Sequence, residues 1–383
     1  MKKRILSILM VLALALSLLP TAAFADEGEF LTPQAEQEEQ AEPVPTVENT
    51  EAIASVNGVE YDTLDAALAA AASAEGGRSE IVLLADVTGT DNAKILIPDD
   101  LTVTLDLNGH ALVGINADCW IENHGSLTIN DRTADSRGIG SGRIYTTNVE
   151  DQGRHAITNY GTLTINGGIF GDKNTDLADA NDVQRGNALR NYGTAEIYGG
   201  AFTACDNYTN GGFAYAIANG SSSYTNATLT VYDAVVYGST NGLIASDGGT
   251  LTVRGGTYTL GDGTEDNLFY IAYSSGEGIV NIEGGTYTRN VNNAHGYFYC
   301  GGGTDGSDAI HISGGTFTDL VNTTINCRGN VTITGGEFTN SDRSNLAAYI
   351  PDGYTLESDG TVAANTSETE GVVAQTGGRY FTT

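Results

Sequence analysis

The residues with the clearest capacity for chemistry lie in one acidic stretch, DKNTDLADAND, and just after it. Calcium binds about six to eight oxygen ligands in proteins, and the carboxylates of this stretch could supply part of such a shell. Arg190 and Glu196 follow, each in the middle of an expected strand with its side chain pointing outward. A solvated acidic loop beside an ordinary surface arginine is the simpler interpretation, and we favour it. The four carboxylates are Asp172, Asp176, Asp179 and Asp182.

Four tyrosines form a second set of candidate binding residues. Tyr160 and Tyr192 each follow an asparagine in the motif NYG, and Tyr198 and Tyr232 each come at the outward end of a short strand. In stacked units, each pair would lie side by side on the outer surface. Exposed tyrosine rings have apolar faces and a hydrated hydroxyl, which suits contact with sugar rings. The alternative is that tyrosine is simply favoured on strand surfaces.

No other catalytic set is apparent in the sequence. The histidines lack the spacing of a metal-binding pair, and no Ser-His-Asp or Cys-His set can be assembled around them. We therefore expect surface or turn histidines at all five positions. They are His110, His124, His155, His295 and His311.

The candidate residues belong to a unit that recurs along the chain. It is clearest from His155 to Phe170, HAITNYGTLTINGGIF, as a strand, a tight turn, a second strand and a Gly-Gly corner before an aromatic residue. The residue that ends the first strand recurs at intervals of 36, 32 and 28 residues and then four times at 27. Such a period is typical of a solenoid. The recurring residues are Asn123, Asn159, Asn191, Asn219, Ser246, Tyr273, Cys300 and Cys327.

The apolar pattern within the unit predicts short strands rather than helices. Leu163 and Ile165 alternate with Thr162 and Thr164, which places the first pair inward. Three such strands per coil, stacked in register ~4.8 Å apart, make an all-β, three-sheet parallel β-helix. We expect inward ladders of aliphatic residues, of asparagines and of aromatic rings. The aromatic ladder comprises Phe170, Phe202, Tyr258, Tyr287, Phe317 and Phe338.

Two cysteines share a slot in this stack. Cys300 and Cys327 are expected in adjacent coils, with Cα atoms ~4.8 Å apart, which lies inside the bonding window for a disulfide. Their Cβ atoms would be parallel and somewhat far apart, so we favour stacked thiols over a bridge. Cys119 and Cys205 have no partner that the repeat identifies.

The N-terminal segments are assigned from composition. Residues 1–25 combine a basic start, an apolar run and a small-residue cleavage site, Ala23-Phe24-Ala25, as in a secretory signal peptide. Residues 26–53 are acidic and contain proline, which predicts a disordered linker. Cleavage would leave 14 basic and 48 acidic residues, a net charge of −34 that repels nucleic acid and anionic lipid. We expect a secreted or cell-surface protein with no membrane span after cleavage.

Both ends of the repeat carry segments suited to closing it. ASVNGVEYDTLDAALAAAA predicts a helix from Asp62 or Thr63 that covers the first coil, and residues 345–363 would cover the last. The β-helix domain thus spans residues 54–363. In residues 364–383, a linker precedes GGRYFT, which repeats the pattern of GVEYDT at Gly58 to Thr63. We expect from this match that the full protein continues into a second β-helix module.

The motifs VNGVEYDTLDAAL, IVLLADVT and LTVTLDLNGHAL, followed by repeated LTI-x-GG-x-F units, resemble secreted bacterial right-handed β-helix proteins of the pectate-lyase-like superfamily. The resemblance covers residues 54–363 and implies a right-handed coil and an extracellular location. This fold carries lyases, hydrolases and adhesins alike. In a lyase, Arg190 with Glu196 nearby would be the closest match to the base beside a calcium site. Of the polygalacturonase motifs, only Asn174-Thr175-Asp176 has a counterpart.

Our functional interpretation is a non-catalytic, adhesin-like protein. Its partner would be a polysaccharide, another glycan or a host surface, bound through the tyrosines. We expect no cofactor, and calcium in the acidic loop is the alternative. A calcium-dependent polysaccharide lyase or a glycoside hydrolase is the alternative, and a structural cell-wall protein is third. Nucleic acid is not an expected partner.

Overall fold

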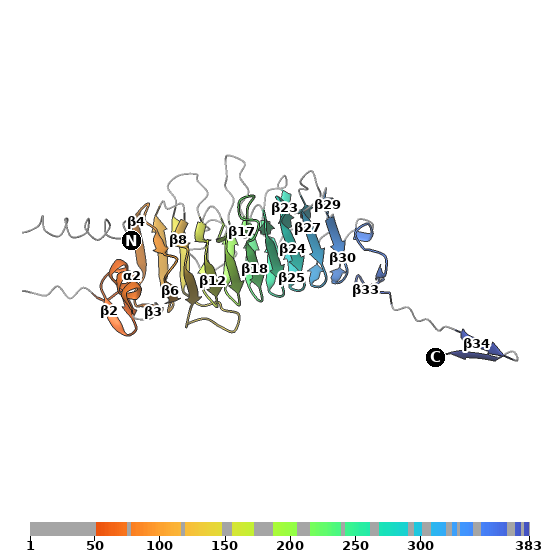
Figure 1. Ribbon diagram of the computed structural model, residues 1–383, viewed down its shortest axis with the longest axis horizontal. Coiled ribbons are helices and arrows are strands. Elements are labelled where there is room, and N and C mark those ends of the chain that lie inside the picture. Colours follow the sequence, from red (N-terminus) through yellow and green to blue (C-terminus); the bar gives the residue numbers. More distant parts are fainter. Residues whose placement is uncertain are drawn as a thin grey trace, which may run out of the picture. The chain divides into compact units, whose positions relative to one another are not determined.

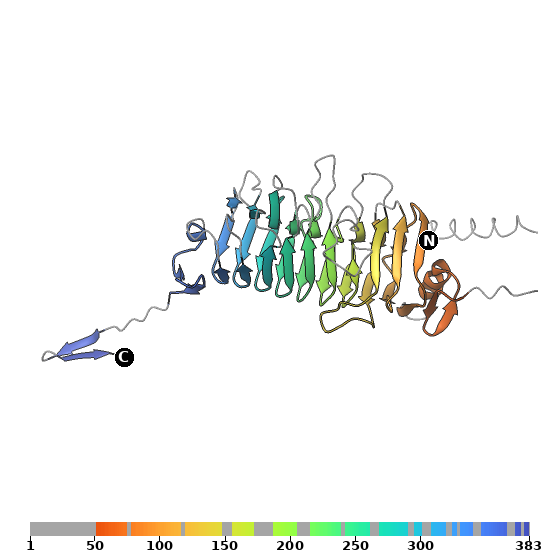
Figure 2. The ribbon, with the colours of Figure 1, turned by 180° about the vertical axis from the view of Figure 1, so that it is seen from behind.

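The structure is a computed structural model of the 383-residue chain (Figure 1, Figure 2). It describes residues 51–74, 78–115, 119–147, 155–171, 187–204, 215–238, 242–260, 268–289, 295–300, 308–318, 324–327, 330–339, 346–365, 372–376 and 379–382. The expected signal peptide and most of the acidic linker lie outside these ranges. No helix in the described part of the chain is long and apolar enough to cross a membrane.

Three long sheets with stacked strands make up the fold, and the chain visits them in turn. From β6 (Thr102–Asp106) the chain enters β7 (Ala111–Ile115) and then β8 (Cys119–Asn123), each in a different sheet. β9 (Ser126–Asn130) then pairs in parallel with β6 and begins the next coil. Figure 1 shows the strands side by side in chain order, from orange to blue. The prediction of an all-β parallel β-helix is confirmed.

The strands of each sheet follow from this order. The 12-stranded sheet contains β2 (Val59–Tyr61), β1 (Ala54–Val56), β3 (Arg78–Leu83), β6, β9, β12 (Thr162–Ile165), β15 (Thr194–Ile197), β18 (Thr228–Val231), β21 (Thr250–Val253), β24 (Ile279–Ile282), β27 (Ala309–Ile312) and β30 (Asn330–Ile333). The 10-stranded sheet contains β31 (Glu337–Thr339), β28 (Thr316–Thr318), β25 (Thr286–Arg289), β22 (Thr257–Leu260), β19 (Val235–Gly238), β16 (Ala201–Ala204), β13 (Ile169–Phe170), β10 (Arg143–Thr147), β7 and β4 (Val87–Asp91). The 9-stranded sheet contains β29 (Thr324–Cys327), β26 (His295–Cys300), β23 (Leu268–Ser274), β20 (Gly242–Ser246), β17 (Tyr215–Asn219), β14 (Leu189–Asn191), β11 (His155–Asn159), β8 and β5 (Ile95–Ile97).

The core consists of residue ladders that run from coil to coil. Ile165, between Ile129 and Ile197 in register, is fully buried, as the alternation in β12 predicts. The predicted aromatic ladder is also confirmed: Phe170 stacks on Phe202 with ring centroids 4.8 Å apart. Val236 interrupts the ring stack in the next coil, and the stack resumes with Tyr258, Tyr287, Phe317 and Phe338 at 4.6–4.7 Å.

The glycine corner lets these rings approach the backbone. Gly168 has a φ of +117°, which a residue with a Cβ rarely adopts. A Cβ built on Gly168 would also lie 2.9 Å from a methyl group of Leu107. The corner therefore needs glycine for its conformation as well as for space.

Asparagines form the predicted buried ladder at the end of the 9-stranded sheet. Nδ2 of Asn123 donates to Oδ1 of Asn159 at 2.6 Å, and the same bond joins Asn159 to Asn191 and Asn191 to Asn219 at 2.7 Å. Each of the three donating amides also donates to a backbone carbonyl at the start of a strand in the next coil, so these inward polar groups are satisfied without water, except for Oδ1 of Asn123. The ladder begins at Asn123 because the preceding slot holds Ile97.

One slot of this ladder was assigned wrongly from the sequence. The residue in register with Ser246 and Cys300 is Ser274, not Tyr273. β23 shifts register between Tyr270 and Ala272, so one coil is a residue longer and the next a residue shorter. The Ser274 hydroxyl donates to the carbonyl of Gly278 in its own turn.

The lids lie at the ends of the stack where they were predicted. Helix α2 (Leu64–Ser73) begins at the N-cap Thr63, whose side chain accepts a hydrogen bond from the backbone N–H of Ala66 at 3.2 Å. Its buried residues Leu64, Ala67 and Ala71 belong to the same core cluster as the first coils. At the other end, residues 346–365 bury Leu346 and include the antiparallel pair β32 (Tyr354–Leu356) and β33 (Val362–Ala364).

The last described strands, β34 (Val372–Thr376) and β35 (Arg379–Thr382), form a hairpin, as β1 and β2 do. The strand pairing of the two hairpins aligns them one residue away from the sequence match, in which Gly58 is aligned with Gly377. Val56 pairs with Val59, and Thr376 pairs with Arg379. This pairing aligns position 58 with position 378 instead.

The cysteine slot is confirmed at the level of the backbone. Cys300 and Cys327 are register partners in the adjacent strands β26 and β29. Their side chains lie outside the described residues, as does Cys205, so the expectation of stacked thiols stays a prediction. Cys119 is buried, and its Sγ lies 3.9 Å from Oε2 of Glu122.

Candidate functional site

The acidic loop falls outside the described residues. Asp172, Asp176, Asp179 and Asp182 all lie between residues 171 and 187, so the calcium prediction rests on the sequence alone. Among the residues that the structure describes, no group of three or more histidines, cysteines or carboxylates could hold a metal ion.

Arg190 and Glu196 lie on different sheets. Arg190 is the middle residue of β14 in the 9-stranded sheet, and Glu196 belongs to β15 in the 12-stranded sheet. Within the described part of the chain, no hydrogen bond or ion pair joins them. The structure therefore does not bring together the pair on which the lyase alternative depended.

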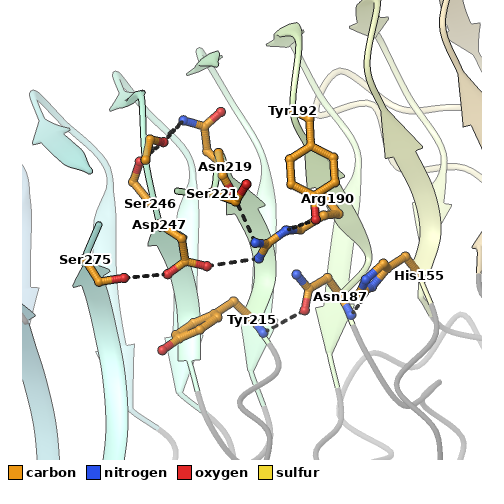
Figure 3. A network of polar contacts seen from close by, with 12 residues as sticks. His155, Asn187, Arg190, Tyr192, Tyr215, Asn219, Ser221, Ser246, Asp247 and Ser275 are labelled. Atoms are coloured by element: carbon orange, nitrogen blue, oxygen red, sulfur yellow. Dashed lines mark hydrogen bonds and ion pairs between the residues drawn. The ribbon is translucent and has the colours of Figure 1, made fainter. Parts of the chain in front are cut away.

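Arg190 instead holds a polar network across three coils (Figure 3). Its Nε donates to the hydroxyl of Tyr192, its Nη2 to the carbonyl of Gly220 and its Nη1 to Oδ2 of Asp247, each at 3.1 Å. Asp247 accepts a further hydrogen bond from Ser275 Oγ at 2.9 Å. All three guanidinium nitrogens are therefore engaged within the protein.

The room for this side chain comes from small residues. Ala218 and Ala245 follow Arg190 in register, and Gly220 follows Tyr192 in the row of turn residues. Without larger side chains in between, the guanidinium reaches over two coils to Asp247, and only 16% of its side chain is exposed. These three small residues are the sequence signal for the network.

The residues directly after the strands of the 9-stranded sheet form one outer row, which we name the turn row. His124 stacks on Tyr160 with centroids 4.8 Å apart, and Tyr160 on Tyr192 at 5.1 Å. The prediction that Tyr160 and Tyr192 stack is confirmed. The ring of Tyr224, from the turn before β18, is tilted against both, with its centroid 5.6 Å from that of Tyr160 and 4.6 Å from that of Tyr192. Burial raises the pKa of the Tyr160 phenol.

The carboxylate of Glu122 lies beside His124, the first stacked ring of the turn row. Glu122 accepts hydrogen bonds from Lys94 Nζ at 2.6 Å and contacts His124 Nε2 at 2.9 Å. The hydrogen bond from Lys94, followed by that from His124, lowers the pKa of the Glu122 carboxyl. The stacking of His124 and the part played by Tyr224 were both missed from the sequence, because neither residue repeats the NYG motif.

The residues directly after the strands of the 12-stranded sheet form a second outer row, the strand-end row. Tyr198 and Tyr232 stack in it with centroids 4.6 Å apart and ring planes 4° apart, as predicted. The Arg254 guanidinium lies 5.2 Å above the centroid of Tyr232 and pairs with Glu283 at 3.2 Å. Both tyrosine hydroxyls lie 3.3 Å from a carboxylate oxygen of Glu196.

Stacking along the rows counts against sugar binding at most of these tyrosines, because stacked rings cover one another's faces. Tyr160 lies between His124 and Tyr192, and Tyr232 lies between Tyr198 and Arg254. Only ring edges are then left for a ligand at these positions. The four tyrosines are therefore not equivalent as binding residues.

Tyr198 is the exception among the four. The residue is 45% exposed, and the described residues place a ring on one face only, that of Tyr232. The other face is turned toward the preceding coil, where the equivalent residue is the shorter, exposed Asn166. A flat apolar face above amide groups is an arrangement that can bind a ring with polar substituents.

Comparisons of the chain with protein-family models, with curated proteins and with solved structures found no match.

Proposed function

We propose that this chain is an exported, non-catalytic protein that binds glycan at the open face of Tyr198. The observation that carries the proposal is the single-sided stacking of that ring. Tyr232 fixes the ring from behind at 4.6 Å, so little conformational entropy is lost when a ligand docks on the front.

The neighbouring coil supplies polar groups that a sugar needs. Asn166 donates from Nδ2 to Oδ1 of Asn130 at 2.8 Å, which orients both amides along the row. Thr164, in register with Glu196, presents a partly exposed hydroxyl beside them. An apolar face with a few fixed polar groups around it is typical of carbohydrate and other small-ligand sites.

The engagement of Arg190 supports a binding role over a catalytic one, since the residue suggested as a base is already paired with Asp247. Export is proposed from the basic, apolar and small-residue segments of residues 1–25. The charge of −34 expected after cleavage disfavours strongly anionic polymers as ligands.

The test is a glycan array followed by titration of the retained glycans. Tyr198→Ala should weaken binding about threefold to tenfold, since an aromatic contact contributes about 0.5–1.5 kcal/mol. Its melting temperature should stay near that of the parent, because the ring is exposed. Tyr224→Ala is the matched control, as Tyr224 is 42% exposed beside the turn row. Equal binding by the parent and Tyr198→Ala would overturn the proposal.

A further inference from the structure

We infer that the glycan bound at Tyr198 carries free amino groups, and that Glu196 selects them. This inference rests on the proposed function, because it names the chemical class of ligand for the same site. It is carried by the position of Glu196 between the two hydroxyls of an aromatic pair, and by the absence of a cation beside it in the described structure.

Glu196 has acceptor capacity to spare. Its Oε2 accepts from the Tyr198 hydroxyl and its Oε1 from the Tyr232 hydroxyl, each at 3.3 Å. A carboxylate has about four acceptor sites, so both oxygens can accept a further donor. Two neutral hydroxyls orient the carboxylate and leave its charge uncompensated.

Three other outward carboxylates in or beside these outer rows are paired with cations. Glu122 pairs with Lys94, Asp247 with Arg190, and Glu283 with Arg254. In the part of the chain that the structure describes, no lysine, arginine or histidine lies within ion-pair distance of Glu196. The fold therefore presents one unpaired negative charge directly beside the open ring.

The aromatic pair already holds a cation on its other side. The Arg254 guanidinium lies 5.2 Å from the Tyr232 centroid, so the two-ring stack ends in a cation–π contact there. The face of Tyr198 offers the same electron-rich surface at the opposite end of the stack. An ammonium group near the hydroxyl edge of Tyr198 could contact both the ring and Glu196, as in other aromatic sites for ammonium ligands.

The chemistry therefore fits a glycan of unacetylated amino sugars, such as a glucosamine oligomer. Acetylation removes the charge and leaves only ring contact and hydroxyl hydrogen bonds. A uronate would place a carboxylate next to Glu196 and be repelled. Combining an exposed ion pair with a cation–π contact, we expect an amine preference of about tenfold.

The experiment titrates the full chain with glucosamine oligomers and with N-acetylated oligomers of the same linkage and length. Mildly acidic pH keeps the amines of the glucosamine oligomers protonated. The parent should bind the amine form about tenfold more tightly, and added salt should reduce this ratio. Glu196→Gln should lose the preference and still bind the acetylated form. Glu283→Gln, which removes an exposed charge from the strand-end row beyond Arg254, should keep the preference.

Each other outcome has a distinct meaning. If the parent binds both oligomers equally, with binding still sensitive to Tyr198→Ala, the amine inference is wrong and the proposed function stands. If Glu196→Gln keeps the preference, or Glu283→Gln loses it equally, the selection is not made by Glu196 and the inference is overturned. If neither oligomer nor any arrayed glycan is retained, the proposed function itself fails.

Discussion

Replacing Asn159 with alanine should cost more stability than the loss of one side chain suggests. Its Nδ2 donates to Oδ1 of Asn191 at 2.7 Å and to the carbonyls of Gly161 and Thr194 at 3.1 Å, and its Oδ1 accepts from Asn123. Alanine leaves the buried Asn191 oxygen without its donor, at about 1–3 kcal/mol, and removes two carbonyl bonds at about 1 kcal/mol each. The free energy of unfolding should fall by about 3–5 kcal/mol.

Asn123→Ala is the matched comparison, because Oδ1 of Asn123 has no hydrogen-bond partner. That substitution takes away one unsatisfied oxygen and leaves another, on Asn159. Asn123→Ala should therefore lower the free energy of unfolding by about 1–3 kcal/mol less than Asn159→Ala does. In the double variant only the Asn191 oxygen is left without a donor, so the two effects should fall short of additivity by a similar amount.

Urea unfolding followed by circular dichroism measures all three variants, provided that the dependence on denaturant is the same in each. An additive cycle would refute the reasoning that the asparagines satisfy one another along the stack. So would an Asn159→Ala variant as stable as Asn123→Ala.

Three further predictions concern single contacts. Because the pKa of Glu122 is lowered in the folded protein, the ionised carboxylate stabilises the fold above its ordinary pKa of 4.5, and this stabilisation is lost as the pH falls. Glu122→Gln should therefore reduce the acid sensitivity of the melting temperature. Equal acid sensitivity in the parent and the variant would contradict this. Tyr287→Phe removes the 3.1 Å hydrogen bond to Gly284 and should cost about 1 kcal/mol in thermal unfolding, while the ring stack on Phe317 persists. With calcium present, the parent should release no unsaturated uronide from pectin or alginate in an absorbance assay; a product that disappears in Arg190→Ala would show that Arg190 is catalytic.

Repetition is what made the fold predictable from the sequence. A polar–apolar alternation as short as that of Leu163 to Ile165 says little alone, but the same alternation at a fixed interval places every copy on the same face of one sheet. The error at Tyr273 arose from the same source. One coil of 28 residues followed by one of 26 has the same sum as two of 27, so the bulge in β23 left no trace in the spacing.

The candidate site was predictable only in part. Register fixed the neighbours of Tyr198 and Tyr232 but not the direction of their rings, and ring direction decides which face a ligand can reach. The contact between Arg190 and Asp247 spans 57 residues and depends on what is missing at Gly220 rather than on a motif. Glu196 was singled out for a lyase-like pairing with Arg190, whereas its contacts are with the tyrosines.

The change from asparagine to serine in the buried ladder has a mechanical consequence. The hydroxyl of Ser274 donates within its own coil, so tension applied at the C-terminal end would detach that coil without breaking a bond of the buried ladder. From Asn219 toward Asn123, each step would instead rupture an amide-to-amide bond of 2.6–2.7 Å. A pulled molecule should therefore yield progressively from one end and then resist. The coil that carries Tyr198 lies in the resisting part, where a ligand bound at that ring would be kept longest.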